Sequence, residues 1–388
     1  MSRVGVVGCG TAGAAAALLL ARAGHDVTVL ERVAEPKPVG AGIIVQPTGQ
    51  AVLARLGLLD AIAARSSRLD RLFLRTSGGR TLVDLHYAEI DPSWYGLGVH
   101  RGVLFAALHD AVTRESRIAL HTGLAVRSLN ELNVFDLVVV ADGTLSQLRD
   151  DLARRDVAYP WGALWFVTED RDRVFEHELY QVATGASRLY GVLPTGTGPS
   201  GDVPMVSLFW SLPARELDAF RRGESFAEWK ADVLAHDPRI AAVLAKLESP
   251  EQLTFARYRD VTMRPWHDRN VVYIGDAAHA TSPQLGQGAN LALVDAAVLA
   301  DSLAQSSSIG AALAAYSRAR TRHIDHYQRM TRLLTPLFQS DSRALGILRD
   351  VTFPLANAIG PFRREMIRTM CGVSRGFLRR ALNVSSPA

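Results

Sequence analysis

A strand, a glycine-rich turn and a helix follow one another at the N-terminus, and this arrangement constrains the fold more than any other feature. Residues 3–7 form an apolar strand, the turn reads Gly8-x-Gly10-x-x-Gly13, and an Ala- and Leu-rich helix continues to about Ala23. Gly8 permits the tight turn, Gly10 lets the backbone approach phosphates, and Gly13 lets the helix pack closely on the strand. The first N–H groups of the helix and its positive end favour a pyrophosphate.

The residues after this helix complete a dinucleotide-binding pattern. Gly24 ends the helix, residues 25–30 read as a second strand, and Glu31 follows it. Glu31 can accept hydrogen bonds from the hydroxyls of an adenosine ribose, and Arg32 can flank the adenine. The alternatives are a glycine-rich turn in an ordinary α/β core or a secretory signal. The promptly following strand argues against the signal.

A second glycine-punctuated segment lies far along the chain. Residues 271–274 predict a strand that ends at Gly275-Asp276, which places a carboxylate at the strand edge where open α/β sheets bind ligands. The glycines that follow allow close approach to a flat ring, and a new helix offers N–H groups to negative charge on it. An ordinary aspartate helix cap is the alternative. The loop residues concerned are Gly286, Gly288, Ala289 and Asn290.

Composition excludes several classes of function. The 388 residues are 48% hydrophobic and 21% charged, which predicts a globular protein in the cytoplasm, of one large or two intertwined domains. The two cysteines, Cys9 and Cys371, indicate neither a disulfide framework nor a metal cluster. The arginines are scattered among acids, so no nucleic-acid partner is expected. A basic C-terminal stretch predicts surface packing or contact with a membrane surface: Arg363, Arg364, Arg368, Arg375, Arg379 and Arg380.

The order of elements predicts an α/β fold in which one domain is interrupted by another. We expect helices at 49–56 and 101–116, a hairpin at 69–74 and 80–85, and strands at 124–129 and 135–141. Aromatic residues between 151 and 263 fall in strand-like runs, which predict a mostly antiparallel sheet with one helix at 214–234. The expected domains are 1–150 with 264–330 for the Rossmann-like nucleotide part (some strands of the other sheet lying near 69–100), 151–263 for the sheet, and 331–388 for C-terminal helices.

Three motifs in this order resemble the single-component FAD-dependent aromatic hydroxylases, the para-hydroxybenzoate hydroxylase-like class. The first is the glycine motif with Glu31, and the second is Asp142-Gly143 with Ser146 and Arg149. The third is Gly275-Asp276-Ala277-Ala278-His279, continuing through Pro283 to Asn290 and Asp295. The resemblance covers residues 1 to about 300. It departs from the family where Val140 replaces a glycine and where the stretch from 125 to 136 is short.

The resemblance implies bound FAD, with NADH or NADPH as a transient co-substrate. In this chemistry NAD(P)H reduces the flavin, O2 adds to give a C4a-hydroperoxide, and an electron-rich aromatic substrate is hydroxylated. No side chain is assigned as a catalyst, His279 is expected to be structural, and Pro283 lies near the oxygen-reacting edge of the ring. The implied FAD contacts are Gly8, Gly10, Thr11, Ala12, Gly13, Glu31, Arg32, Gly42, Arg101, Val126, Asp142, Asp276, Pro283, Gly286, Gly288, Ala289 and Asn290.

The substrate and the partners are less constrained. Location alone makes Tyr180, Tyr190, Phe209 and Trp210 candidate substrate contacts, with Arg188 available to an acidic substrate. We expect a small aromatic substrate, O2, and a monomer or homodimer. The alternatives are an FAD-dependent reductase of isoprenoid-type substrates, a quinone-precursor hydroxylase at the membrane surface, and a flavin-binding protein without turnover. Three lysines and the lack of a Trp-x-Trp-x-Ile-Pro motif disfavour a flavin-dependent halogenase.

Overall fold

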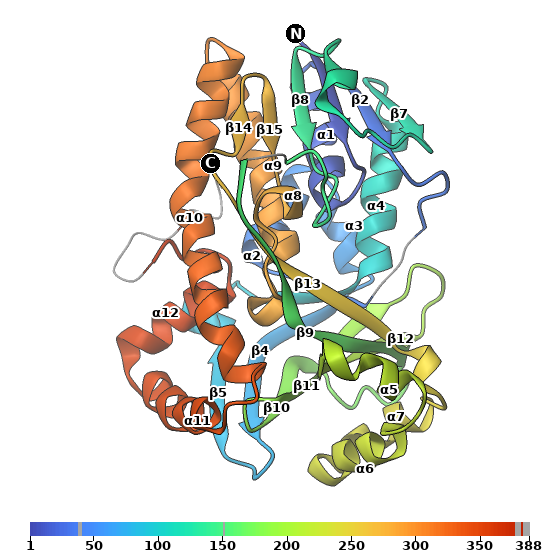
Figure 1. The fold of residues 1–388 in the computed structure, drawn as a ribbon, viewed down its shortest axis with the longest axis vertical. Coiled ribbons are helices and arrows are strands. Elements are labelled where there is room, and N and C mark those ends of the chain that lie inside the picture. Colours follow the sequence, from blue (N-terminus) through green and yellow to red (C-terminus); the bar gives the residue numbers. More distant parts are fainter. Residues whose placement is uncertain (38–40, 150–151, 377–381, 383–388) are drawn as a thin grey trace.

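The computed structural model describes residues 1–37, 41–149, 152–376 and 382, which build two β-sheets and the helices around them (Figure 1). The first sheet has the order β14-β15-β8-β1-β2-β7 and is parallel except for the β14–β15 pair. Its strands are β1 (Arg3–Val7), β2 (Asp26–Glu31), β7 (Ile118–Thr122), β8 (Leu137–Val140), β14 (His267–Asp268) and β15 (Val271–Tyr273).

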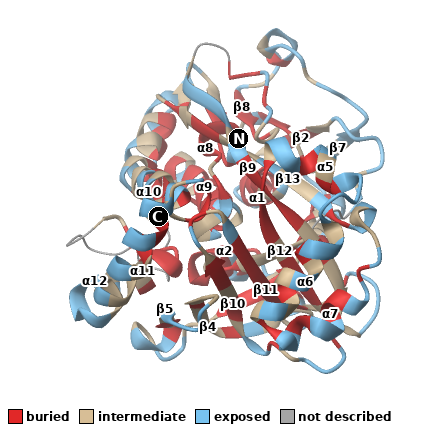
Figure 2. Cartoon of the chain, turned by 60° about the horizontal axis from the view of Figure 1, so that its bottom comes forward, coloured by how far each residue is buried: buried red, intermediate tan, exposed pale blue. Residues whose placement is uncertain are grey.

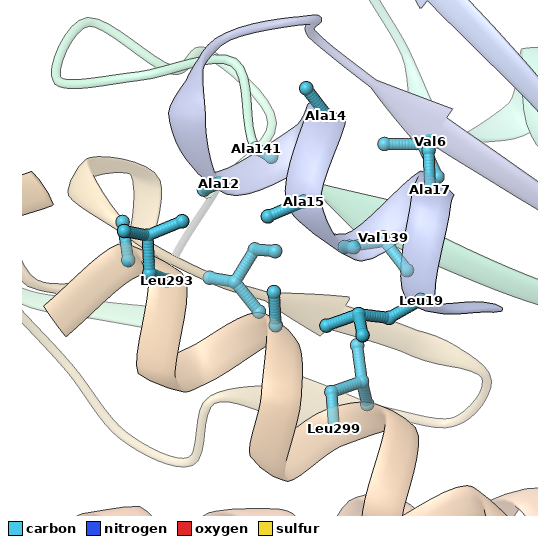
Figure 3. Close-up of a cluster of buried hydrophobic side chains, with 14 of the residues drawn as sticks. Val6, Ala12, Ala14, Ala15, Ala17, Leu19, Val139, Ala141, Leu293 and Leu299 are labelled. Atoms are coloured by element: carbon cyan, nitrogen blue, oxygen red, sulfur yellow. The ribbon is translucent and has the colours of Figure 1, made fainter. Parts of the chain in front are cut away.

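The first sheet packs against a helix pair built from small and aliphatic residues. Ala12, Ala15 and Leu19 of α1 (Thr11–Arg22) face Leu293 and Leu299 of α9 (Gly288–Ala304) in one buried cluster (Figure 3). The alanines let the helices approach closely, and the first residues of both helices line one cavity. The other helices of this part are α2 (Pro47–Arg55), α3 (Leu59–Ala63), α4 (Arg101–Arg114), α8 (Asp276–His279) and α10 (Ile309–Phe338).

The second sheet is mostly antiparallel and has the order β13-β9-β12-β11-β10-β4-β6-β3, with β5 paired to β4. The β10–β4 pair is parallel. Its strands are β3 (Gly42–Val45), β4 (Ser67–Thr76), β5 (Thr81–His86), β6 (Gly96–His100), β9 (Ala153–Glu169), β10 (His177–Thr184), β11 (Arg188–Thr197), β12 (Pro204–Pro213) and β13 (Thr254–Met263).

Both faces of the second sheet are covered over much of its length, so its strands are largely buried (Figure 2). One face packs on α5 (Leu217–Arg221), α6 (Phe226–His236) and α7 (Ala241–Ala245). Beside the other face lie the C-terminal half of α10, α11 (Arg343–Ala358) and α12 (Gly360–Met370). Short 3-10 turns connect these elements: Tyr87–Glu89, Leu129–Leu132, Ala214–Glu216, Pro238–Ile240, Pro250–Gln252 and Pro283–Leu285.

The α/β fold with an antiparallel second sheet and C-terminal helices is confirmed, with two local corrections. The predicted strand at 124–129 is wrong, because β7 is used earlier to pair with β2 and residues 124–128 form no regular structure. The predicted helix at 214–234 is divided, because Gly223 adopts a φ of 82° and turns the chain between α5 and α6. Arg379 and Arg380, part of the basic stretch for which surface packing or membrane contact was predicted, lie outside the described residues.

The helices and the basic C-terminal stretch can be compared with what contact with a membrane would require. Among the described residues, no helix combines the length and the apolar character that crossing a bilayer requires. Arg363 of the basic C-terminal stretch forms an ion pair with Glu89, and Arg368 lies 4.0 Å from Glu365. These two arginines are therefore paired with the protein itself.

Candidate functional site

The turn between β1 and α1 uses its three glycines in different ways. Gly8 has a φ of 95°, and a Cβ there would lie 2.6 Å from the carbonyl oxygen of Ala141. A Cβ on Gly13 would lie 2.0 Å from the carbonyl oxygen of Gly8, so the packing of the chain itself requires both glycines. A Cβ on Gly10 would meet no protein atom within 4 Å. The space beside Gly10 is therefore available to a ligand.

The start of α1 offers uncapped donors to that space. Its N-cap residue is Gly10, which supplies no side chain to the first turn. The N–H groups of Thr11, Ala12 and Gly13 have no acceptor within the helix, because the first turn of any helix lacks them. Together with the helix dipole they form a site for an anion such as a pyrophosphate.

Glu31 is held against the same turn, at the end of β2. Its Oε2 accepts a hydrogen bond of 2.8 Å from the backbone N–H of Cys9, and its Oε1 accepts one of 2.9 Å from that of Val33. The next residue, Arg32, is exposed. Burial, with a smaller effect from Glu31, raises the pKa of the Cys9 thiol to about 12. Cys9 is therefore a neutral packing residue.

The loop after β8 carries Asp142, whose carboxyl group is partly buried. Oδ1 of Asp142 is buried and has no hydrogen-bond partner among the described residues, and burial raises the pKa of this carboxyl group. An unsatisfied buried polar atom is uncommon in folded proteins and fits a donor that a ligand supplies. Thr144 donates a hydrogen bond of 3.1 Å to Oδ2 of Asp276. This bond joins the loop to the second glycine segment.

Arg149 holds the same two loops together. It is buried, and its guanidinium donates to the carbonyl oxygens of Ala277 at 3.2 Å and Thr144 at 2.9 Å. It also forms an ion pair of 2.6 Å with Asp156. These contacts engage the guanidinium within the protein, so Arg149 is a positioning residue for the loops.

A buried carboxylate fixes the turn that follows β15. Asp295 accepts a hydrogen bond of 2.8 Å from the N–H of Gly275 and lies 2.5 Å from Nε2 of His279. Its other oxygen accepts from Nε of Arg320 at 2.7 Å. Burial by itself would raise the pKa of Asp295, but His279 and Arg320 outweigh it and hold the pKa well below the usual range. His279 is engaged by Asp295, as expected of a structural residue.

Asn290 connects the second glycine segment to the second sheet. Its Oδ1 accepts a hydrogen bond of 2.8 Å from the N–H of Gln46. Its Nδ2 donates to the carbonyl oxygens of Ile44 at 3.0 Å and Gly286 at 3.2 Å. The side chain of Asn290 is thus used inside the protein, and only its backbone remains for a ligand.

These loops open onto one cavity of about 1340 Å³ that extends to the second sheet. Among the predicted FAD contacts, those that line it are Gly10, Thr11, Ala12, Gly42, Arg101, Asp276, Pro283, Gly286, Gly288 and Ala289. The others are not among the residues that line it: Gly8, Gly13, Glu31, Arg32, Val126, Asp142 and Asn290. Val126 is partly buried against the core of the first sheet.

The predicted substrate contacts divide between the two faces of the second sheet. Phe209 lines the cavity and packs against Trp165, with ring centroids 5.1 Å apart. Tyr180, Tyr190 and Trp210 instead lie in the core between the sheet and α5–α7. Adjacent residues of a strand point to opposite faces, so β12 can present only one of Phe209 and Trp210 to the cavity. The structure therefore corrects the expectation for Tyr180, Tyr190 and Trp210.

Sequence reasoning missed several cavity residues, among them Trp165, Tyr258 and His326. Trp165 is the cross-strand partner of Phe209. The pairing register of β9 against β12 would therefore have indicated that Trp165 faces the same cavity as Phe209. Burial raises the pKa of Tyr258 to about 12 and lowers that of His326 to about 4. Both side chains are therefore neutral at pH 7.

Comparison with known proteins identifies the family. A family model described as an FAD binding domain matches residues 1–122 and 134–331. A probable 2-heptyl-3-hydroxy-4(1H)-quinolone synthase from Rhodococcus erythropolis is 30% identical over 84% of this chain and 85% of its own length. The chain belongs to the FAD-dependent aromatic hydroxylases. This hydroxylase is also 31% identical to the kynurenine 3-monooxygenase of Salinispora arenicola, over 83% of this chain and 77% of that protein.

The fold agrees with this membership. The tetrameric form of 2-methyl-3-hydroxypyridine-5-carboxylic acid oxygenase has a TM-score of 0.75 to the hydroxylase at 22% identity, covering 94% and 96% of the two chains. The cofactor of the family is FAD, and this site fits it in three respects. There is space beside Gly10, the first turn of α1 is uncapped, and a buried oxygen of Asp142 has no partner within the described part of the chain.

Proposed function

We propose that the hydroxylase acts on a neutral aromatic ring that lies between the cofactor loop and the Trp165–Phe209 pair. One observation carries this proposal: Pro283 to Ala289 and the aromatic pair line the same cavity. Two of the relatives are named for a quinolone and for kynurenine. Flat side chains such as Trp165 and Phe209 favour stacking with such rings.

We assign the adenosine and pyrophosphate end of FAD to the first sheet. Thr11 and Ala12 offer N–H groups to the pyrophosphate, Glu31 accepts from the ribose, and Asp142 takes a donor of the cofactor. The flavin end is assigned to the loop from Pro283 to Ala289. The first sheet with α1, α4 and α9 is then the FAD-binding domain, and the second sheet is the substrate domain. The other proposed contacts are Gly8, Gly10, Gly13, Arg32, Gly42, Arg101, Val126, Asp276 and the backbone of Asn290.

Bound FAD supplies the redox chemistry, passing electrons from NADH or NADPH to O2 and one oxygen atom to the substrate. The reaction consumes NAD(P)H, a proton, O2 and an aromatic C–H, and yields NAD(P)⁺, water and a phenol. The protein contributes position and exclusion of water. Arg149 and Asp295 fix the two cofactor loops, and the largely apolar cavity keeps water from the reacting ring.

The charges around the cavity support a neutral substrate. Arg188, the candidate for a substrate carboxylate, forms an ion pair of 3.1 Å with Asp232 and is exposed. Arg332 does line the cavity, but it pairs with Asp260 at 2.8 Å. A substrate carboxylate would have to compete with Asp260 for that guanidinium.

Purified protein tests the proposal directly. We expect a yellow protein with bound FAD whose NADH or NADPH oxidation is stimulated by one class in a panel of phenols, aminobenzoates, indoles and quinolones. O2 consumption and a product that has gained one oxygen atom distinguish hydroxylation from the reductase alternative. A colourless protein that FAD cannot reconstitute, or one that holds FAD without any stimulated O2 consumption, would contradict the proposal. We also propose a monomer or homodimer, which light scattering checks.

A further inference from the structure

The cavity continues beyond the cofactor loops into a region between the second sheet and the C-terminal helices. Each of these helices presents one side to it. α11 contributes Leu345, Leu348 and Ala356, at the i, i+3 and i+11 spacing of a single helix face. We call this region the tail compartment. The polar helical residues of the lining include Thr352 and Thr369. The apolar helical residues are Met330, Leu333, Leu334, Leu337, Leu345, Leu348, Phe353, Ala356, Phe362, Met366 and Met370.

The sheet side of the tail compartment is equally apolar. Alternate residues of neighbouring strands face it, as the two-residue period of a strand requires. Gln181 and Ser211 are polar exceptions in this lining. The apolar strand residues are Leu72, Leu74, Val83, Leu85, Leu179, Leu189 and Leu193.

The charged groups that line the whole cavity do not select a charged ligand in the tail compartment. Among the described lining residues they are Arg101, Asp276, Arg332 and Glu365. Arg101 and Asp276 come from the cofactor side, and Arg332 is paired with Asp260. Glu365 accepts a hydrogen bond from Ser374 and lies 4.0 Å from Arg368. Burying an unpaired charge among aliphatic side chains is unfavourable, so the compartment favours a neutral, apolar group.

The tail compartment opens to solvent between α10, α11 and α12. Leu333, Leu348 and Phe362 line the cavity, yet 64%, 51% and 49% of their surfaces are exposed. These three residues belong to α10, α11 and α12, which lie together at one end of the molecule (Figure 1). We call the opening that they line the mouth. The charged lining residues nearest to this mouth, Arg332 and Glu365, have partners in Asp260 and Arg368, so an apolar group can enter without desolvating an unpaired charge there.

α11 is fixed in place rather than loosely packed over the sheet. The buried Arg349 donates hydrogen bonds to the carbonyl oxygens of Gly185 at 2.8 Å and Leu337 at 3.1 Å. A Cβ on Gly346 would lie 2.9 Å from the backbone nitrogen of Ala186, so the helix is in close contact with the β10–β11 hairpin. The compartment is thus a formed part of the structure.

We propose that the tail compartment binds a hydrocarbon chain attached to the aromatic ring that the enzyme hydroxylates. The substrate class is then an uncharged alkyl-substituted aromatic, with its ring beside Trp165 and Phe209 and its chain between the sheet and α11. This inference rests on the proposed function, because it takes the ring to lie at the cofactor loop. The mouth admits the chain, and the compartment determines its length.

A homologous series tests the inference on FAD-loaded protein. We would titrate 4-alkylphenols with chains from ethyl to octyl and follow the flavin absorption and the heat of binding. Each added methylene should tighten the dissociation constant about fourfold, equivalent to ~0.8 kcal/mol, until the compartment is filled. Chains of equal length that end in a carboxylate should bind at least about tenfold more weakly. A dissociation constant independent of chain length, equal binding of the carboxylates, or no binding by the whole series would overturn the inference.

A matched pair of variants locates the chain. Ala356→Phe fills the compartment, and Ala358→Phe makes the same change at an exposed position of α11 that is not part of the lining. The first should remove the advantage of octyl over ethyl and leave ethyl binding unchanged, whereas the second should alter neither. Equal effects of both variants would overturn the assignment to α11. If Ala356→Phe does not hold FAD, the series on the unaltered protein still decides.

The two proposals fail in different ways. Hydroxylation of short phenols with no chain-length dependence would overturn the tail compartment and leave the proposed function standing. Chain-length-dependent binding without stimulated NAD(P)H oxidation would contradict the proposed function and leave the compartment standing.

Discussion

The side-chain oxygen of Asn290 accepts a hydrogen bond of 2.8 Å from the backbone N–H of Gln46, although the two residues are 244 positions apart in the chain. The amide nitrogen of Asn290 donates to Ile44 and Gly286. One side chain therefore fixes the cofactor loop against the second sheet. The relative position of cofactor and substrate depends on it, because those two parts carry the two sides of the cavity.

Asn290→Asp tests this connection. The substitution keeps the size of the side chain but turns its donor into an oxygen that faces two carbonyl oxygens. We expect a loss of about 2–3 kcal/mol in the free energy of unfolding and reduced FAD content. Urea unfolding and the ratio of flavin to protein absorbance measure both. Asn130→Asp, at an exposed position, is the control and should change neither. Unaltered stability of the Asn290 variant would contradict the role assigned to it.

The glycines of the first turn should respond differently to substitution. Gly10→Val places its Cβ where no atom of the described residues lies within 4 Å, so we expect normal stability of the apoprotein with loss of bound FAD. Gly13→Ala forces a Cβ against the carbonyl oxygen of Gly8 and should destabilise the apoprotein itself by about 1–3 kcal/mol or more. Apoprotein unfolding and FAD titration separate the two effects. Normal FAD affinity of Gly10→Val would refute a cofactor beside this residue.

Phe209 and Trp210 are neighbours on β12 with opposite surroundings. Trp210→Ala removes a ring from the core against Tyr190 and Trp229, so we expect a loss of about 3–5 kcal/mol in unfolding free energy. Phe209→Ala removes a ring from the cavity lining and should chiefly raise the dissociation constant of the aromatic substrate. Thermal unfolding and substrate titration of the two variants give the comparison. A larger stability loss for Phe209→Ala than for Trp210→Ala would contradict the assigned faces.

His326 should make the protein less stable in mild acid. Burial lowers its pKa in the folded state to about 4 from the ordinary 6.5. As the pH falls below about 6.5, His326 of the unfolded chain binds a proton, whereas His326 of the folded chain does not bind it until the pH reaches about 4. The free energy of unfolding therefore decreases across this interval. Because the ring is partly exposed, we expect a loss of about 1–2 kcal/mol.

The comparison with His326→Gln isolates this contribution. The variant should lose less unfolding free energy between pH 7 and pH 4 than the unaltered protein, by that same amount. His121→Gln, at an exposed position, should follow the unaltered protein. Identical profiles of unfolding free energy against pH for the His326 variant and the unaltered protein would show that the pKa of His326 is not lowered in the folded state.

Local rules were sufficient for the first glycine segment. Gly8, Gly13 and Glu31 belong to one strand–helix–strand unit, in which short-range sterics decide which residue can occupy each place. The same rules failed at 124–129, where residues suited to a strand have no neighbouring strand with which to pair. Local rules also did not predict the ion pair of Asp295 with Arg320, because Arg320 comes from a different helix.

The α/β fold, the two glycine segments and the family could be inferred from the amino-acid sequence alone. It took the folded structure to show that Phe209 faces the cavity while Tyr180, Tyr190 and Trp210 do not. Both faces of the second sheet are covered, so apolar residues occupy successive positions and their alternation does not reveal which face meets the ligand. The tail compartment likewise required the structure. Its lining comes from three helices and the strands of one sheet, and no local pattern records how such distant surfaces enclose a space.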